Sequence, residues 1–350
     1  MLYRTSDFDY SLPAGQIAQH PLPDRAASRL LLLDRSSGAL RHAHFRDIVA
    51  LIAPEDVVVL NVSRVIPARL RGIRVPGSGT RIPGGEAEIL LVRELPDGSW
   101  LAMGHPGGKL KPGRIVRFGD DSAVEIVEML GGGLRRVRFV GALDVPATLA
   151  KYGETPLPPY IRRPPGPEDR ARYQTVYAAH DGSVAAPTAG LHFTRELLEQ
   201  VRASGTAVAT LDLHVGPGTF KPVEVDDLAR HPMHAEPYAM SEEAAATING
   251  RREAGGRIWA VGTTVVRTLE TCADAQGVIR PGAGETALFI YPPYRFRAAD
   301  RLLTNFHLPR STLLMLVCAF GGYENVMRAY EAAVREGYRF YSYGDAMAVL

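Results

Sequence analysis

The sequence has 350 residues, of which 46% are hydrophobic and 22% are charged, as in an ordinary globular protein. A net charge of +2, from 40 basic and 38 acidic residues, excludes nucleic-acid binding by overall charge, so any RNA contact has to come from a local patch. The N-terminus has no signal-peptide run, no apolar stretch is long enough to cross a bilayer, and two cysteines make no disulfide framework, so we expect a cytoplasmic protein.

The first predicted element is a buried strand at residues 57–60. Fifteen of the 35 glycines then fall between Gly72 and Ala150, where short apolar runs alternate with turn residues. The runs are 87–95, 100–103, 114–118, 123–130 and 134–140. A strand every 8–12 residues or so is typical of a small all-β barrel or sandwich. We therefore predict a small inserted β domain at residues 69–157.

Strand and helix patterns alternate after Pro158. Thr194 and Ser241 are predicted N-caps. The expected helices are 195–204, 242–253, 263–271, 311–320 and 324–336, and the expected strands are 207–215, 257–261, 287–291, 302–306 and 340–343. Residues 1–68 and 158–350 are thus predicted to form one discontinuous α/β (α+β) domain around a sheet.

Common nucleotide and metal motifs are missing from the sequence, which has no G-x-G-x-x-G after a strand, no G-x-x-x-x-G-K-[ST] and no H-E-x-x-H. Five polar clusters in the α/β part remain as candidates. The first, residues 182–194, has small residues that let the backbone approach a ligand, and His192 stands just before a helix start. A tight, close-packed connection explains the same pattern equally well.

The second cluster, residues 211–220, places Asp212 and His214 on one face of a strand. A histidine at a strand end can be an acid or a base, although it is as often structural. The third cluster, residues 231–236, has two histidines and Glu236, which could bind zinc. Because Pro232 breaks any helix that would align the histidines, the polar wall of an active site is favoured and no metal is expected.

The fourth and fifth clusters, residues 262–270 and 304–315, each join a strand end to a helix start. Backbone N–H groups at such a junction can hold a carboxylate or phosphate. Simple N-capping by a threonine explains the fourth cluster without a ligand. Since open α/β sheets bind ligands at strand ends, five such junctions favour one shared cleft over five structural coincidences.

Taken in order, these clusters resemble the S-adenosylmethionine:tRNA ribosyltransferase-isomerase family of queuosine biosynthesis over nearly the whole chain. Further matching segments are 8–13, 17–19, 28–30, 60–61, RVIPARL at 64–70, Tyr177 and YSYGDAM at 341–347. The resemblance implies a large mixed β-sheet with a small inserted closed barrel. It also implies two substrates, S-adenosylmethionine and a tRNA carrying 7-aminomethyl-7-deazaguanine at the wobble position. The products would be epoxyqueuosine-tRNA, adenine and methionine.

The resemblance also implies a set of site residues. The candidate acids and bases are His214, His192, His234 and Glu236. Arg267 or Arg310 would hold the methionine carboxylate or an RNA phosphate, and Tyr177, Phe193 or Phe220 would stack on the target base. The remaining substrate-binding candidates are Asn61, Arg64, Ser183, Thr188, Gly216, Gly218, Thr219, Thr263, Thr264, Asn305, His307 and Ser311. S-adenosylmethionine is consumed as a co-substrate, no metal or permanent cofactor is expected, and we expect a monomer that contacts no membrane.

Two other functions compete with this interpretation. A metal-dependent hydrolase could use the histidines, and metal analysis of the purified protein would reveal it. A non-catalytic RNA-binding protein could use the barrel as an oligonucleotide platform, which predicts binding without turnover. The second alternative leaves the polar strand ends of the α/β part unexplained.

Overall fold

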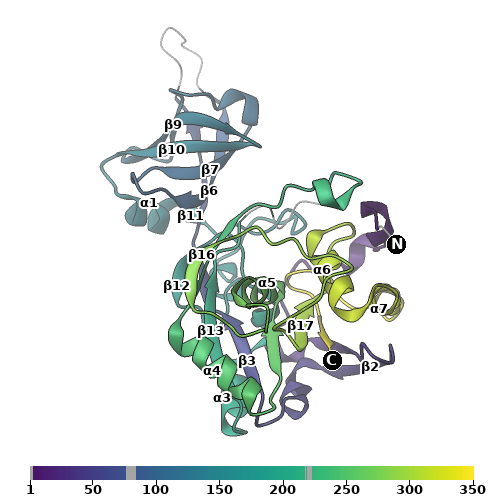
Figure 1. Ribbon diagram of the computed structural model, residues 1–350. Helices are drawn as coiled ribbons and strands as arrows, with labels where there is room; N and C mark the ends of the chain where they lie inside the picture. Colours follow the sequence, from purple (N-terminus) through teal and green to yellow (C-terminus); the bar gives the residue numbers. More distant parts are fainter. Residues whose placement is uncertain (1–2, 76–83, 217, 219–222) are drawn as a thin grey trace.

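The structure is a computed structural model that describes residues 3–75, 84–216, 218 and 223–350. Figure 1 shows a large α/β body, which contains both ends of the chain, and a smaller β body beside it. Among the described helices, none combines the length and the apolar character that a membrane span requires.

A nine-stranded sheet forms the centre of the larger body. From edge to edge its strands are β16 (Gly282–Thr286), β14 (Glu236–Met240), β13 (Ala207–Leu213), β3 (Val57–Asn61), β15 (Ile258–Val261), β17 (Arg301–Asn305), β18 (Ala346–Val349), β1 (Arg29–Leu33) and β2 (Leu40–His44). β3 pairs in parallel with β13 and β15, whereas β14 runs antiparallel to both of its neighbours and β18 runs antiparallel to β17. The predicted large mixed sheet is confirmed.

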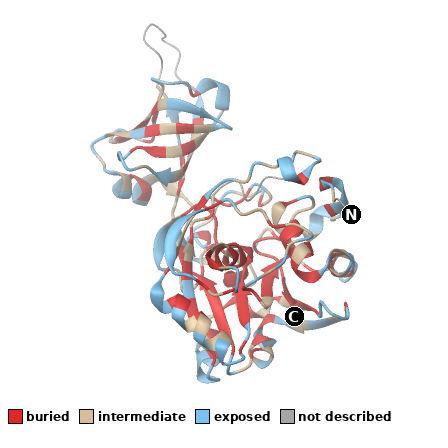
Figure 2. Cartoon of the chain, viewed as in Figure 1, coloured by how far each residue is buried: buried red, intermediate tan, exposed pale blue. Residues whose placement is uncertain are grey.

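The central strands of the sheet are buried on both faces, because their alternate residues enter two different cores. Val57 and Val59 pack with one hydrophobic cluster, and Val58 and Leu60 pack with another. The first cluster includes residues of α4 (Glu242–Glu253), α5 (Thr263–Cys272), α6 (Thr312–Gly321) and α7 (Tyr323–Arg335), and the second includes α3 (Arg195–Ala203). Figure 2 shows this buried interior in red.

Side-chain caps fix where these helices begin. The Thr194 hydroxyl accepts a hydrogen bond from the Leu197 N–H at 3.1 Å, and the Ser241 hydroxyl accepts one from the Ala244 N–H at 3.1 Å. Both residues are N-caps, as the sequence predicted. Ser311 caps α6 in the same way.

The smaller body is built on a second, antiparallel sheet. Its order is β11 (Gly153–Glu154), β5 (Arg69–Arg74), β6 (Glu86–Glu94), β7 (Trp100–His105), β10 (Leu134–Gly141), β9 (Ser122–Gly131) and β8 (Ile115–Arg117). β5 also pairs with β8. A short helix, α1 (Val145–Tyr152), packs against a hydrophobic core that this sheet has to itself. Every pairing of these seven strands in the described residues is within the same sheet.

Two smaller elements complete the connection between the bodies. β4 (Ser63–Val65) pairs in parallel with β12 (His180–Ser183), and α2 (Asp169–Arg172) is a single helical turn.

Two predicted strands are wrong. Residues 287–291 form no strand, and the strand β16 lies just before them at Gly282–Thr286. Leu288 and Phe289 pack on the core without pairing, so their apolar character reflects burial rather than a ladder. The closing strand is β18 at Ala346–Val349 and not residues 340–343, where Phe340 is a core residue. The strands β1, β2 and β14 were not predicted.

Candidate active site between the two sheets

A large cleft of about 870 Å³ separates the two sheets, within the range of roughly 300–1,000 Å³ that is common for ligand sites. One wall carries residues that follow or begin strands of the nine-stranded sheet, and the other carries residues of the seven-stranded sheet. The cleft brings together three candidate acids or bases, His214, His234 and Glu236, with Gly216 and Gly218. The sequence analysis expected all five polar clusters to share one cleft. These five residues come from two of the clusters and line the same cleft.

A second, much smaller cavity of about 60 Å³ lies on the other side of the segment that follows β13. Val215 lines this cavity, whereas its neighbours His214 and Gly216 line the large cleft. Six candidates predicted from three different clusters meet here, namely Thr188, Thr263, Thr264, Asn305, His307 and Ser311. The two cavities are therefore neighbours across one residue of the chain.

His214 is held by its backbone and by a glycine. Its N–H donates to the Pro237 carbonyl at 3.0 Å, which ties it to the start of β14. Gly182 has φ of 140°, and a Cβ there would lie 2.9 Å from the imidazole ring, so only glycine leaves the ring its place. The His214 Nδ1 is buried and has no partner in the described part of the chain. Burial lowers the pKa of His214, and the nearby Asp212 carboxylate opposes that shift.

Asp212 pairs with a histidine that the sequence analysis did not single out. The His180 Nδ1 lies 2.8 Å from the Asp212 Oδ2. These residues are 32 positions apart, and only the parallel pairing of β12 with β4 brings His180 to this place. No local spacing in the sequence signals this contact.

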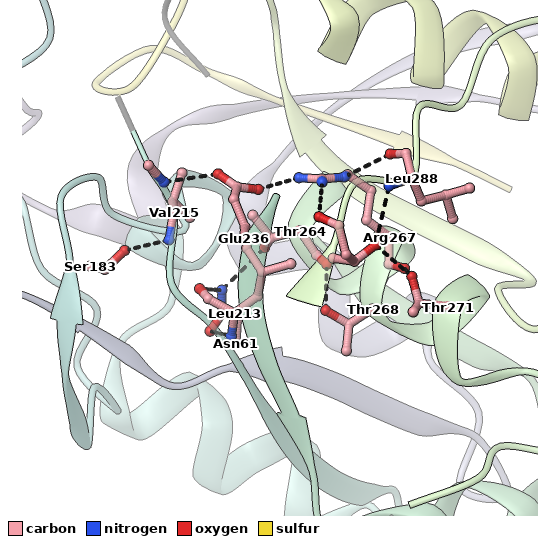
Figure 3. Close-up of polar contacts among 12 residues, drawn as sticks. Asn61, Ser183, Leu213, Val215, Glu236, Thr264, Arg267, Thr268, Thr271 and Leu288 are labelled. Atoms are coloured by element: carbon pink, nitrogen blue, oxygen red, sulfur yellow. Dashed lines mark hydrogen bonds and ion pairs between the residues drawn. The ribbon is translucent and has the colours of Figure 1, made fainter. Parts of the chain in front are cut away.

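Glu236 and Arg267 form a buried ion pair beside the cleft (Figure 3). Their exposed fractions are 6% and 4%. The other Glu236 oxygen accepts from the Gly216 N–H at 2.8 Å, while Arg267 also donates to the Leu288 and Thr286 carbonyls. The charge of Arg267 is consequently neutralised by Glu236, and its other N–H groups are bound to two backbone carbonyls. The structure therefore does not leave Arg267 free to bind a substrate carboxylate.

His234 reaches the cleft from the loop before β14. The residue is exposed, and its ring lies against Gly218, where a Cβ would come within 2.6 Å of it. His231 points elsewhere and packs edge-on against Phe289 at 5.2 Å between ring centroids. Within the described residues, no group of three or more histidine, cysteine or acidic side chains is arranged to hold a metal ion.

The small cavity is built from two helix starts. Thr263 and Thr264 begin α5 after Gly262, whose φ is 98°, and Ser311 caps α6. The first N–H groups of each helix are oriented toward its N-terminal end, where anions are stabilised. Because both starts line the same cavity, the cavity combines two such ends.

Asn305 and His307 belong to a buried polar network at this cavity. The Asn305 amide donates to the Tyr341 carbonyl and to the His192 Nε2, both at 3.1 Å. The Asn305 Oδ1 is buried and accepts nothing within the described structure. His307 bonds Thr304 through Nε2 at 2.7 Å, and burial lowers the pKa of His307 to about 3.

His192 lines neither of these two cavities. Its Nδ1 contacts the Ser28 hydroxyl at 2.6 Å, its Nε2 accepts from Asn305, and its ring stacks on Phe45. Burial lowers the pKa of His192 to about 3. A neutral imidazole whose two nitrogens are both occupied has a structural role here, so His192 does not stand where the sequence analysis expected a catalytic base.

The pKa of His192 predicts a dependence of stability on pH. Its unfolded pKa is near 6.5 and its folded pKa about 3, so the unfolded chain binds one more proton between these values. The free energy of unfolding should therefore fall as the pH drops below about 6.5. In His192→Gln the slope between about pH 6 and pH 4 should be shallower by roughly 1.4 kcal/mol per pH unit. Denaturant titrations measure this, with the exposed His20→Gln as control; equal slopes in both variants would contradict it.

Several other predicted site residues make contacts that hold the fold together. Phe193 is fully buried and packs edge-on against Phe45, and Tyr177 packs against the same core. The Asn61 amide joins β3 to β13 by bonding Leu213, and the Ser183 hydroxyl accepts from the Val215 N–H. Arg64 donates to the Ala178 carbonyl on the surface. Thr219 and Phe220 lie outside the described residues.

Arg310 is a surface residue whose guanidinium pairs with Asp9. Because the side chains are 51% and 41% exposed, Arg310→Ala should change the free energy of unfolding by less than about 1 kcal/mol. The sequence predicts, separately, that this variant loses roughly 1.5–3 kcal/mol of substrate-binding free energy from one charge-assisted bond. Calorimetry of the variant with S-adenosylmethionine and with tRNA tests that prediction. Undiminished affinity for both removes Arg310 from the site.

The cleft wall from the seven-stranded sheet was not predicted as part of the site. It carries the apolar residues Val92, Trp100, Leu101, Met103 and Leu134 together with the charged Arg93 and Glu94. Apolar residues at strand spacing predict a sheet, and their position opposite His214 depends on how the two sheets are placed.

The chain matches the family model described as queuosine biosynthesis protein over residues 5–349. It is 52% identical to the S-adenosylmethionine:tRNA ribosyltransferase-isomerase of Moorella thermoacetica and 51% identical to that of Symbiobacterium thermophilum, covering 99% of this chain and 100% of each relative. The crystal structure of an S-adenosylmethionine tRNA ribosyltransferase from Thermotoga maritima is similar, with a TM-score of 0.57 and 38% identity over 99% of this chain and 100% of that one.

Proposed function

This chain belongs to the family of queuosine biosynthesis proteins, and we propose that it is an S-adenosylmethionine:tRNA ribosyltransferase-isomerase, as its relatives are named. The enzyme transfers the ribosyl group of S-adenosylmethionine to 7-aminomethyl-7-deazaguanine at the wobble position and isomerises it, giving epoxyqueuosine-tRNA, adenine and methionine. One observation carries the site assignment: His214, which follows β13, and His234 and Glu236, just before and at the start of β14, line one cleft that is large enough for a nucleoside.

The cleft residues supply the acid and base that this reaction requires. The sulfonium acidifies the neighbouring ribosyl carbon, and His214, neutral because burial lowers its pKa, takes that proton. His234 gives a proton to the departing adenine. The neutral tRNA amine bonds to a ribosyl carbon and gives up one proton, and a ribosyl oxygen displaces methionine from the deprotonated carbon as the epoxide closes. Glu236 is a positioning residue, because both of its oxygens already hold Gly216 and Arg267.

The small cavity is proposed to bind the amino-acid end of S-adenosylmethionine. The helix starts at Thr263 and Ser311 stabilise its carboxylate. The unpartnered Oδ1 of Asn305 accepts from its ammonium group. Because Val215 separates this cavity from His214, a substrate held here extends its ribosyl carbon past Val215 into the cleft.

The architecture is proposed to be that of two domains. The additional β5–β8 pairing supports a seven-stranded sheet that closes on itself as a barrel. Residues 69–157 form this inserted domain, and residues 1–68 and 158–350 form the catalytic one. The enzyme is a cytoplasmic monomer that consumes S-adenosylmethionine and needs no metal.

Product analysis tests the proposed reaction. Incubated with S-adenosylmethionine and tRNA bearing the aminomethyl base, the protein should release adenine and methionine in equal amounts, and the tRNA should gain the ribosyl-derived group. Release of S-adenosylhomocysteine would indicate a methyltransferase instead. Adenine release without the tRNA would indicate a hydrolase, and loss of turnover on chelation with recovery on zinc addition would contradict the metal-free assignment.

A further inference from the structure

The outer face of β7 is apolar where it meets the cleft. Trp100 and Ala102 point into the core of the seven-stranded sheet and are buried. Leu101 and Met103 alternate with them, are partly exposed and line the cleft. An antiparallel sheet usually places polar residues on its solvent face. Leucine and methionine at these positions therefore indicate a surface that binds something.

The apolar face extends over the neighbouring strands. Met103 stands opposite Leu134 of β10 in the strand register, and Leu134 also lines the cleft. Val92 of β6 contributes from the other side of β7. These four residues, Val92, Leu101, Met103 and Leu134, are called the apolar wall below. The apolar wall lines the same cleft as His214, His234 and Glu236.

A cation without a partner lies at the same cleft. Arg170, on α2, lines the cleft and is exposed, and its guanidinium makes no hydrogen bond or ion pair with any described residue. Among the acidic lining residues, Asp144 caps α1 and Asp181 faces Arg64 at 3.7 Å, whereas Glu94 is exposed on β6. Arg170 is consequently available to bind an anion that comes with the ligand of the apolar wall.

We propose that the apolar wall binds the flat face of a nucleobase in a single-stranded RNA segment, and that Arg170 binds a phosphate of that same segment. Bases splayed out of an RNA loop pack their faces on aromatic or apolar side chains, while arginine binds the phosphates of the backbone. S-adenosylmethionine accounts for this site less well: although its adenine also has an apolar face, it carries no phosphate for Arg170, and its carboxylate is assigned to the small cavity. The inference rests on the proposed function and adds to it the surface that recognises the RNA.

Matched substitutions test the apolar wall. In Met103→Glu, we expect the KM for tRNA to rise by about tenfold and the KM for S-adenosylmethionine to stay within about twofold, because a charge replaces the contact of a base. Met129→Glu is the control, since Met129 is 45% exposed on β9 and lines neither cavity. Met103→Ala provides a milder variant if the charged one folds poorly by calorimetry.

Salt dependence tests Arg170. For an anticodon stem-loop, the slope of log Kd against log salt concentration should be smaller by about 0.7 in Arg170→Ala than in the wild type, because one phosphate contact of a single strand is lost. The control Arg138→Ala removes an exposed arginine of β10 that does not line the cleft, and its slope should equal that of the wild type.

Two outcomes would overturn the proposal. One is an unchanged KM for tRNA in both Met103 variants, and the other is an equal rise in both KM values, which would assign the wall to S-adenosylmethionine. Failure of the proposed function is distinguishable, because the wild-type protein would then release no adenine with the correct tRNA.

Discussion

Replacing His214 with alanine is expected to lower turnover by ~10²–10⁴-fold, the range for loss of a general base. The imidazole lines the cleft, is neutral near pH 7 because burial lowers its pKa, and keeps its Nδ1 free of partners in the described structure. Single-turnover release of adenine with saturating tRNA measures the effect. In the wild type, the acid limb of the pH–rate profile should lie below the usual histidine pKa of 6.5.

The control for this prediction is His231→Ala. His231 is in the same cluster of the sequence as His234 but packs on Phe289 and does not line the cleft. It should retain nearly full turnover. If His214→Ala is equally active, the base lies elsewhere, and His234 is the next residue to test.

The second large effect is expected on stability, from Arg267→Ala. The substitution leaves the Glu236 carboxylate buried without its counter-charge, and breaking a buried ion pair in this way costs about 3–5 kcal/mol. It also removes the donors to the Leu288 and Thr286 carbonyls. Denaturant unfolding should show the loss directly.

Two variants make this measurement specific. Arg46→Ala breaks an exposed pair with Asp24 and should cost less than about 1 kcal/mol. Adding Glu236→Gln to Arg267→Ala removes the buried charge and should restore part of the stability. A loss in Arg267→Ala no larger than that in Arg46→Ala would contradict the buried-pair account.

Local signals in the sequence predicted much of the fold. The caps Thr194 and Ser241 gave the starts of α3 and α4 correctly, because capping depends on residues within one turn. The short apolar runs between residues 87 and 140 correspond to strands β6 to β10, because an apolar run and the turn residues that flank it are also a local signal. The edge strand β16 escaped because Gly282–Thr286 has little β propensity and is held by its pairing with β14.

The site was harder to predict than the fold. Motif spacing pointed correctly to residues that share a cleft, such as His214 and Glu236. It could not separate them from His192, because the bonds to Ser28 and Asn305 that occupy this histidine come from distant strands. The apolar wall depends on how one sheet faces another, which no local pattern encodes.

The most direct test of the proposed site is a crystal structure with S-adenosylmethionine and an anticodon stem-loop bearing the aminomethyl base. A variant such as His214→Ala would slow the reaction enough to keep both substrates bound. We predict the amino-acid end in the small cavity beside Thr263 and Asn305, and the ribosyl carbon in the cleft, next to the position of the lost imidazole. A ribosyl group bound outside the cleft between the two sheets would contradict the assignment.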